Sequence, residues 1–299
     1  MTSALFFGSP AAAVPSLAAV ADTVDLRGVV TRPPTPRGRG RTTGPTPVAE
    51  AADGLGVPIH TPASKAELAA LPLDVEIAIV VAFGMLIPPQ VLSAPRLGFL
   101  NVHFSLLPRW RGAAPVERAI LAGDTHTGVC LMQMDEGLDT GPVFACAEMP
   151  IGDRTAGALT GALADEGAAL LRRSLPDVAA GRLVAHAQEG EPTHAPKLTR
   201  DEAMLDLRAP TEEILRRVRA FTPRPGASVA TEDGPMKIWD ADPSGARLHP
   251  GEWHHEGGRV LVGTGDGALR LREVQAPGGR RMDAAAWANG RRGAFPTIE

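Results

Sequence analysis

The chain has 299 residues, which suggests one large domain or two of ordinary size. Hydrophobic residues (44%) and charged residues (21%) occur at ordinary levels, which excludes global disorder. The net charge of −4 means that any nucleic-acid contact must come from a local basic patch.

The cysteine content and the hydropathy pattern limit where the protein acts. Cys130 and Cys146 are the only cysteines, which excludes a disulfide framework and argues against a thiolate zinc site. A reducing compartment fits this composition best. No apolar run approaches the roughly 20 residues of a membrane helix, and no basic targeting segment is present at the N-terminus. We therefore expect a cytoplasmic protein that does not associate with membranes and acts as a monomer.

The first 180 residues alternate between apolar, strand-like runs and helix-like stretches. Residues 74–82 give the strongest strand prediction, because the run is almost continuously apolar, rich in β-branched residues and followed by Gly84. Such strands are usually covered on both faces of a parallel sheet. The other predicted strands are 4–7, 26–30, 99–103 and 128–134, and the predicted helices are 12–21 and 156–173. The pattern predicts a Rossmann-like, doubly wound, mostly parallel α/β domain over residues 1–185.

The last third of the chain has a different pattern. A polar segment with two prolines, residues 186–203, predicts a linker. A helix is then predicted to begin at Thr211, with acidic residues first and basic residues last, as the helix dipole favours. Short predicted strands separated by glycine turns follow at 227–230, 236–239, 259–262 and 268–274. These features predict a C-terminal domain over residues 204–299 that forms an OB-like β-barrel.

A basic, proline-rich segment follows the second predicted strand. Residues 31–48 hold five prolines and four arginines, which excludes a helix or an interior strand. Because the segment leaves the carboxyl end of a strand, it lies on the side of the sheet where ligands bind. A basic loop there is suited to order against the backbone of a nucleic acid.

The residues best suited to chemistry lie in two segments. Asn101 and His103 are two apart on the predicted strand 99–103, so their side chains share one face near its carboxyl end. An amide donor beside an imidazole can polarise a carbonyl group and move a proton. The segment 134–142 carries three acids among glycines, of which Asp139 is expected to reach His103 and hold its tautomer or favour its charged form.

These segments carry a family resemblance. Asn-x-His-x-Ser-Leu-Leu-Pro from Asn101, followed by Asp-x-Gly-x-Asp-Thr-Gly from Asp135, resembles the 10-formyltetrahydrofolate-dependent formyltransferases. The string Ser-Leu-Leu-Pro-Arg-Trp-Arg-Gly-Ala-Ala-Pro over 105–115 is similar to the branch that acts on methionyl-tRNA, as are 7–10 and 195–198. The resemblance implies the formyltransferase fold. It also implies an enzyme of translation initiation that moves a formyl group from 10-formyltetrahydrofolate, a cosubstrate, to the α-amino group of methionyl initiator tRNA, without a metal.

The resemblance also implies roles for single residues. Asn101 would bind the formyl oxygen and stabilise its negative charge. His103 would act as general acid and base, and Asp139 would orient and support His103. The turn Ser105, Leu106, Leu107 and Pro108 would line the folate site.

Two more segments have implied roles. Residues 83–87 would pack near the pterin. Phe104 departs from the family pattern, which usually has a small residue at this position. The Gly-Arg-Gly-Arg centre of the basic segment resembles the family's tRNA-inserting loop, which makes Arg39 and Arg41 the expected tRNA contacts. The C-terminal domain, residues 204–299, is also expected to bind tRNA.

Two other functions stay open. A sister formyltransferase acting on glycinamide ribonucleotide or a sugar nucleotide would share the same three catalytic residues, but the arginine-rich loop and the added β domain argue against it. A non-catalytic nucleotide- or RNA-binding protein with a Rossmann-like sheet and an OB-like module is supported only by analogy at the level of the fold.

Overall fold

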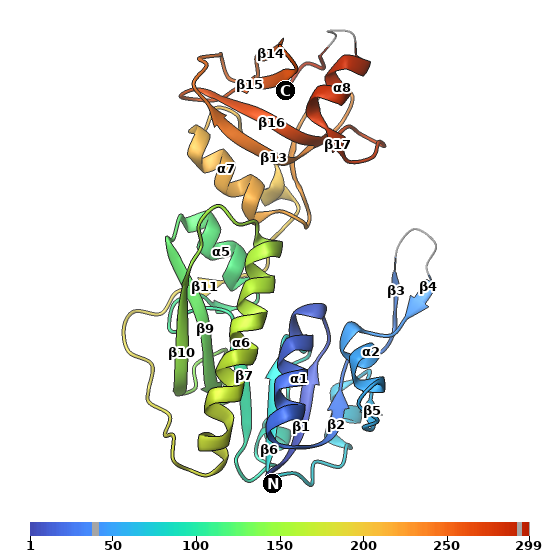
Figure 1. Ribbon diagram of the computed structural model, residues 1–299, viewed down its shortest axis with the longest axis vertical. Helices are drawn as coiled ribbons and strands as arrows, with labels where there is room; N and C mark the ends of the chain where they lie inside the picture. The colour runs from blue at the N-terminus through green and yellow to red at the C-terminus, as the bar shows by residue number, and fades with distance from the viewer. Residues whose placement is uncertain (38–41, 292–294, 299) are drawn as a thin grey trace. The chain divides into compact units, whose positions relative to one another are not determined.

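The computed structural model describes residues 1–37, 42–291 and 295–298. The chain forms two compact units (Figure 1). Unit 1 consists of Met1–Pro115, His126–Pro150 and Thr160–Ala195, and unit 2 consists of Val116–Thr125, Ile151–Leu159 and Pro196–Glu299. The units therefore do not follow a single cut along the chain. The domain boundaries drawn from the sequence (1–185, 186–203 and 204–299) stay a prediction.

Unit 1 is built on a seven-stranded sheet with the order β10-β9-β7-β6-β1-β2-β5. Its strands are β1 (Ser3–Gly8), β2 (Asp25–Val30), β5 (Ile59–His60), β6 (Ile77–Val81), β7 (Phe99–His103), β9 (His126–Gln133) and β10 (Val143–Pro150). The five strands from β7 to β5 are parallel, and β9 and β10 are antiparallel to their neighbours. The chain runs outward from β1 to β2 and β5, and then crosses to β6 and β7. The predicted mostly parallel α/β sheet is confirmed.

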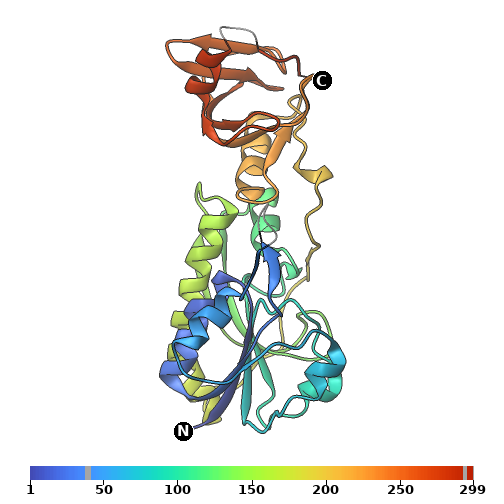
Figure 2. The ribbon, with the colours of Figure 1, turned by 90° about the vertical axis from the view of Figure 1, so that its right-hand side faces the viewer.

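Helices cover both faces of this sheet, as the apolar strands require. Phe6, Ile79 and Leu100 belong to a buried cluster with α1 and α6, whereas Phe7, Val80 and Phe99 belong to a second cluster with α3 and α4. Figure 2 shows the two sets of helices on opposite sides of the sheet. Their bounds are α1 (Val14–Thr23), α2 (Pro47–Asp53), α3 (Lys65–Ala69), α4 (Pro89–Leu92) and α6 (Ala156–Ala179), and a 3-10 turn at Ala11–Ala13 precedes α1.

Local sequence signals explain where several elements begin and end. The Thr46 side chain caps α2 by accepting from Ala49 N, and Pro47 occupies the first turn of that helix. Ser64 caps α3 in the same way by accepting from Glu67 N. Strand β6 begins at Ile77, three residues after the predicted start, and ends at Val81, because Ala82 has a φ of 47° and cannot continue an extended strand.

Among the described residues of the basic segment 31–48, none lies in an interior strand, but Pro47 and Val48 begin α2, so the expectation that the segment contains no helix is wrong at its end. Strand β3 (Thr35–Arg37) pairs with β4 (Thr42–Gly44) in a separate two-stranded sheet. The last two residues of the segment are the first two of α2. Arg39 and Arg41 lie outside the described residues.

Unit 2 is an antiparallel sheet with helices against it. The sheet has the order β12-β13-β16-β15-β14, and β17 pairs with β16. Its elements are α5 (Pro115–Ala122), α7 (Thr211–Ala220), β12 (Ala227–Val229), β13 (Met236–Ser244), β14 (Trp253–Glu256), β15 (Arg259–Gly263), β16 (Ala268–Gln275), β17 (Met282–Asp283) and α8 (Ala284–Gly290). Ile214, Val218 and Phe221 of the α7 region pack on sheet residues such as Ile238 and Leu269. The predicted C-terminal β domain is confirmed, whereas α5, β14, β17 and α8 are not predicted from the sequence.

The two cysteines are joined by a bond that the composition does not predict. Cys130 on β9 lies directly opposite Cys146 on β10, and the two form a disulfide. Two cysteines give no expectation of a disulfide, and this single bond forms because strand register brings together two residues that are 16 apart in sequence. Among the described residues, no helix has the length and apolar character needed to cross a membrane.

Candidate active site

The carboxyl end of β7 positions Asn101 and His103. The strand lies between parallel β6 and antiparallel β9, so its backbone is fixed on both sides. Because side chains alternate along a strand, Asn101 and His103 share the face to which buried Phe99 contributes. His103 is only 6% exposed. From β1, the strand order proceeds outward to β2 and β5 on one side and to β6 and β7 on the other, so it reverses between β1 and β6. The carboxyl ends of the strands beside such a point are the usual ligand position in open α/β sheets.

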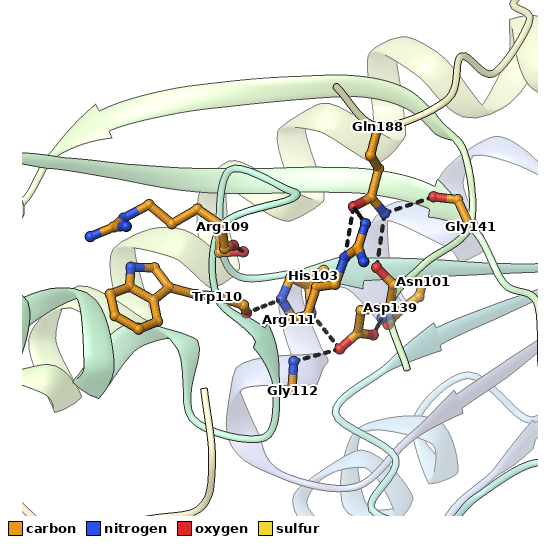
Figure 3. A network of polar contacts seen from close by, with 10 residues as sticks. Asn101, His103, Arg109, Trp110, Arg111, Gly112, Asp139, Gly141 and Gln188 are labelled. Carbon is orange, nitrogen blue, oxygen red and sulfur yellow. Dashed lines mark hydrogen bonds and ion pairs between the residues drawn. The ribbon is translucent and has the colours of Figure 1, made fainter. Parts of the chain in front are cut away.

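Asp139 reaches these two side chains from the loop between β9 and β10. Its Oδ1 lies 3.5 Å from Asn101 Nδ2, and its Oδ2 lies 3.7 Å from His103 Nδ1 (Figure 3). Gly112 N donates to Asp139 Oδ2 at 2.8 Å. The structure therefore brings together the three residues that the sequence selects as catalytic. Their chemical roles stay a prediction.

The backbone of Asp139 is in an unusual conformation. Its φ is 54°, in the left-handed region, which costs a non-glycine residue about 1 kcal/mol. Such conformations persist where surrounding contacts hold them, and they often occur at functional sites. Here the conformation accompanies a carboxylate that points toward Asn101 and His103.

Both ring nitrogens of His103 face oxygen atoms. Nε2 lies 2.9 Å from the carbonyl oxygen of Trp110, and Nδ1 faces the Asp139 carboxylate. Because a carbonyl oxygen can only accept, the hydrogen bond to Trp110 requires a proton on Nε2. The site is therefore suited to an imidazole that carries a proton and delivers it.

The turn after β7 brings Trp110 and Gly112 into position. Ser105 is fully buried, and its Oγ donates to the carbonyl oxygen of Arg109 at 2.6 Å. The Leu107–Pro108 peptide is cis. The Ser105 hydroxyl thus holds the turn that the sequence assigns to the folate site. The assignment of Ser105, Leu106, Leu107 and Pro108 to folate stays a prediction.

The other acids of the Asp139 loop have different surroundings. Asp135 Oδ1 accepts from Gly137 N at 3.0 Å and from Thr140 Oγ1 at 2.6 Å, so it shapes the turn. Glu136 is exposed. Only Asp139 of the three acids contacts Asn101 and His103.

Gln188 and Arg111 are part of the same network, and the sequence gives no sign of it. Arg111 donates to Gln188 Oε1 from Nε at 3.0 Å and from Nη2 at 2.6 Å. Gln188 Nε2 donates to the carbonyl oxygens of Asp139 and Gly141, each at 2.8 Å (Figure 3). Gln188 lies in the segment predicted to be a linker, where a single polar residue carries no functional signal.

Possible metal ligands do not gather in the described part of the chain. No three His, Cys, Asp or Glu side chains among the described residues lie close enough together to hold an ion.

Comparison with known proteins gives consistent matches over most of the chain. A family model described as "Formyl transferase" matches residues 8–175, and one described as "Formyl transferase, C-terminal domain" matches residues 197–292. The chain is 43% identical over 293 residues to the methionyl-tRNA formyltransferase of Clavibacter sepedonicus, and 44% identical over 294 residues to that of Novosphingobium aromaticivorans. Both matches cover 96% of this chain and 96% of the relative. The solved structure of a HypX variant from Aquifex aeolicus superposes with a TM-score of 0.72 at 17% identity, over 98% of this chain and 48% of that chain, a likeness of fold.

Proposed function

Because the chain belongs to the formyl transferase family, we propose that it transfers the formyl group of 10-formyltetrahydrofolate to the α-amino group of methionine on initiator tRNA. The relatives that bear this activity in their names match over 96% of this chain, so the similarity includes both units. The observation that carries the proposal is the convergence of Asn101, His103 and Asp139 at the carboxyl end of β7.

The surroundings of this cluster fit a flat, partly apolar donor. Leu86, after β6, is 69% exposed, and Leu138, beside Asp139, is 58% exposed. Ligand sites are commonly lined by apolar side chains with a few polar groups among them. We assign residues 83–87 and the turn Ser105, Leu106, Leu107 and Pro108 to the folate. The donor supplies an activated formyl carbon.

Asn101 is suited to stabilise negative charge on the formyl oxygen. A carboxamide nitrogen has two N–H bonds, and among the described residues the Asn101 amide makes only the long contact to Asp139 Oδ1. It can therefore donate to an oxygen that becomes negatively charged when the amine attacks. A fixed donor of this kind typically contributes roughly 10²–10³ in rate.

His103 and Asp139 are suited to move protons. The attacking α-amine has a pKa of about 8 and must be uncharged to act as a nucleophile. Asp139 is placed to accept a proton from this amine, directly or through water. The folate nitrogen that departs gains a proton from His103, so the amine loses one proton and the leaving group takes one up.

The acceptor tRNA is proposed to contact the basic segment between β3 and β4. Arg39 and Arg41 provide charge for the phosphate backbone, and flanking glycines let the chain approach it closely. The segment follows β2, whose carboxyl end lies on the edge of the sheet that carries the catalytic cluster. The proposal places the reaction in the cytoplasm, with initiation of translation.

A substrate comparison tests this function. The full chain is incubated with 10-formyltetrahydrofolate labelled in the formyl group and with methionyl initiator tRNA, glycinamide ribonucleotide or an amino-sugar nucleotide. We expect label to enter only the aminoacyl-tRNA. Label on either small acceptor would favour the sister formyltransferases, and no transfer to any acceptor would favour a binding protein.

A further inference from the structure

The segment that carries Gln188 is fixed to unit 1 on both sides of this residue. Two residues before it, His186 and Val143 exchange backbone hydrogen bonds of 2.7 and 2.9 Å. After it, β11 (His194–Ala195) pairs in parallel with β8 (Arg111–Gly112). The position of Gln188 is therefore set by strand pairing.

The carboxamide of Gln188 uses all of its main hydrogen-bonding capacity. Its oxygen accepts twice from Arg111, and its nitrogen donates twice, to Asp139 O and Gly141 O. Turning the amide over would put its N–H bonds against the guanidinium group, so one orientation is favoured. The charged donor also polarises the amide, which strengthens the two bonds that its nitrogen donates.

Two supports meet on Asp139 from adjacent residues of the chain. Gly112 N holds the carboxylate, and the Arg111 side chain holds the Asp139 carbonyl through Gln188. The left-handed φ of Asp139 makes such support necessary, since an unrestrained loop relaxes to other conformations.

We infer that Gln188, held by Arg111, is a positioning residue for formyl transfer, which aims the Asp139 carboxylate at Asn101 and His103. The inference rests on the proposed function. Gln188 acts through Asp139, so its removal lowers the rate of the chemical step and has little effect on folate binding.

The test compares Gln188→Leu with the wild-type chain in single-turnover formylation of methionyl-tRNA, with enzyme in excess. Residues that orient metal ligands by a hydrogen bond typically contribute about 10- to 100-fold, and by analogy we expect a fall of that size in the single-turnover rate constant. The Kd of 10-formyltetrahydrofolate should change by less than about threefold. Gln275→Leu is the matched control. Gln275 accepts from Trp239 Nε1 at 3.1 Å and donates to Gly279 O at 3.0 Å in unit 2, so its variant should react at the wild-type rate.

A double-mutant cycle separates positioning from general stability. In an Asp139→Ala background, Gln188→Leu should change the rate by less than about threefold, because the carboxylate that Gln188 positions is absent.

If Gln188→Leu fails to fold, Gln188→Glu replaces it, because glutamate keeps the acceptor for Arg111 and loses both donors to the Asp139 loop. A wild-type rate in these variants, or an undiminished fall in the Asp139→Ala background, would overturn the inference. Absence of transfer by the wild-type chain would instead overturn the proposed function.

Discussion

The polar side chains of the catalytic cluster and those on the surface of unit 2 are organised differently. At the end of β7, groups that are mostly buried make directional hydrogen bonds between three separate segments, and two of those segments contain left-handed residues, Trp110 and Asp139. In unit 2, many charged groups form exposed ion pairs, such as Arg272 with Asp242, whose side chains are 52% and 41% exposed. Exposed pairs contribute about 0–1 kcal/mol. We therefore expect substitutions in the cluster to lower the reaction rate, and substitutions in the surface ion pairs to have little effect on either rate or stability.

The largest effect is expected for Asn101→Ala. Loss of a donor that stabilises developing charge should lower the turnover number roughly 10²–10³-fold while the fold is kept. Steady-state formylation and thermal unfolding measure the two consequences. Asn289→Ala, on the exposed side of α8, is the matched control and should behave as the wild-type chain does. A wild-type turnover number for Asn101→Ala would show that this residue of the cluster is no more important for the reaction than an exposed surface residue.

A smaller effect is expected for Gly112→Ala, which changes only backbone geometry. Gly112 has a φ of 120°, and an added Cβ would lie 2.9 Å from the Ala195 carbonyl oxygen. The strain should displace the N–H that holds Asp139, lowering the rate about 10-fold and the stability by about 1–3 kcal/mol. Gly245→Ala has open space and serves as the control in the same rate and unfolding measurements. Equal behaviour of the two variants would contradict the role given to Gly112.

Arg39→Ala removes a positive charge outside the catalytic cluster and tests whether tRNA binding can be weakened separately from folate binding. We expect the KM for methionyl-tRNA to rise by roughly 10-fold, because a phosphate contact is lost, while folate binding is kept. Arg27→Ala removes an exposed charge from β2 and should leave this KM unchanged. An equal loss of tRNA and folate binding in Arg39→Ala would reject its assignment to tRNA.

The smallest effect is expected for the pH dependence of the stability that Glu202 contributes in unit 2. Hydrogen bonds from Arg118, and then from Thr199 N, lower the pKa of Glu202 from 4.5 to about 2. A lowered pKa in the folded state gives stability that is present above pH 4.5 and is lost as the pH falls toward 2. Because the Glu202 side chain is 34% exposed, solvent screening limits the contribution to about 1 kcal/mol.

Urea unfolding at pH 6 and pH 3 measures this contribution. Arg118→Ala should lose more stability relative to wild type at pH 6 than at pH 3. Arg208→Ala is the control. Its pair with Asp206 is more exposed (83% and 55%) and should give no measurable change in stability, although the pKa of Asp206 is also lowered to about 2. A pH-independent loss in Arg118→Ala would contradict the account.

The parts of the fold that depend on local sequence are predictable. Strand β7 has the predicted bounds, because its apolar run and its polar end both lie on one short strand. The side chains that alternate along it place Asn101 and His103 together without knowledge of the rest of the molecule.

The parts that depend on contacts between distant segments are not predictable in this way. Strand register pairs Cys130 with Cys146, and strand pairing around residues 186 and 194 brings Gln188 to the Asp139 loop. Neither register leaves a mark in the local sequence, so the disulfide and the Gln188 bridge appear only in three dimensions.

The most direct test of the catalytic cluster is single-turnover formylation of methionyl-tRNA by His103→Ala beside His254→Ala. We expect a fall of roughly 10²-fold or more in the single-turnover rate constant of His103→Ala. Wild-type behaviour is expected for His254→Ala, whose side chain is 49% exposed on β14. A correctly folded His103→Ala variant that transfers formyl at the wild-type rate would show that His103 is not the general acid and base of the reaction.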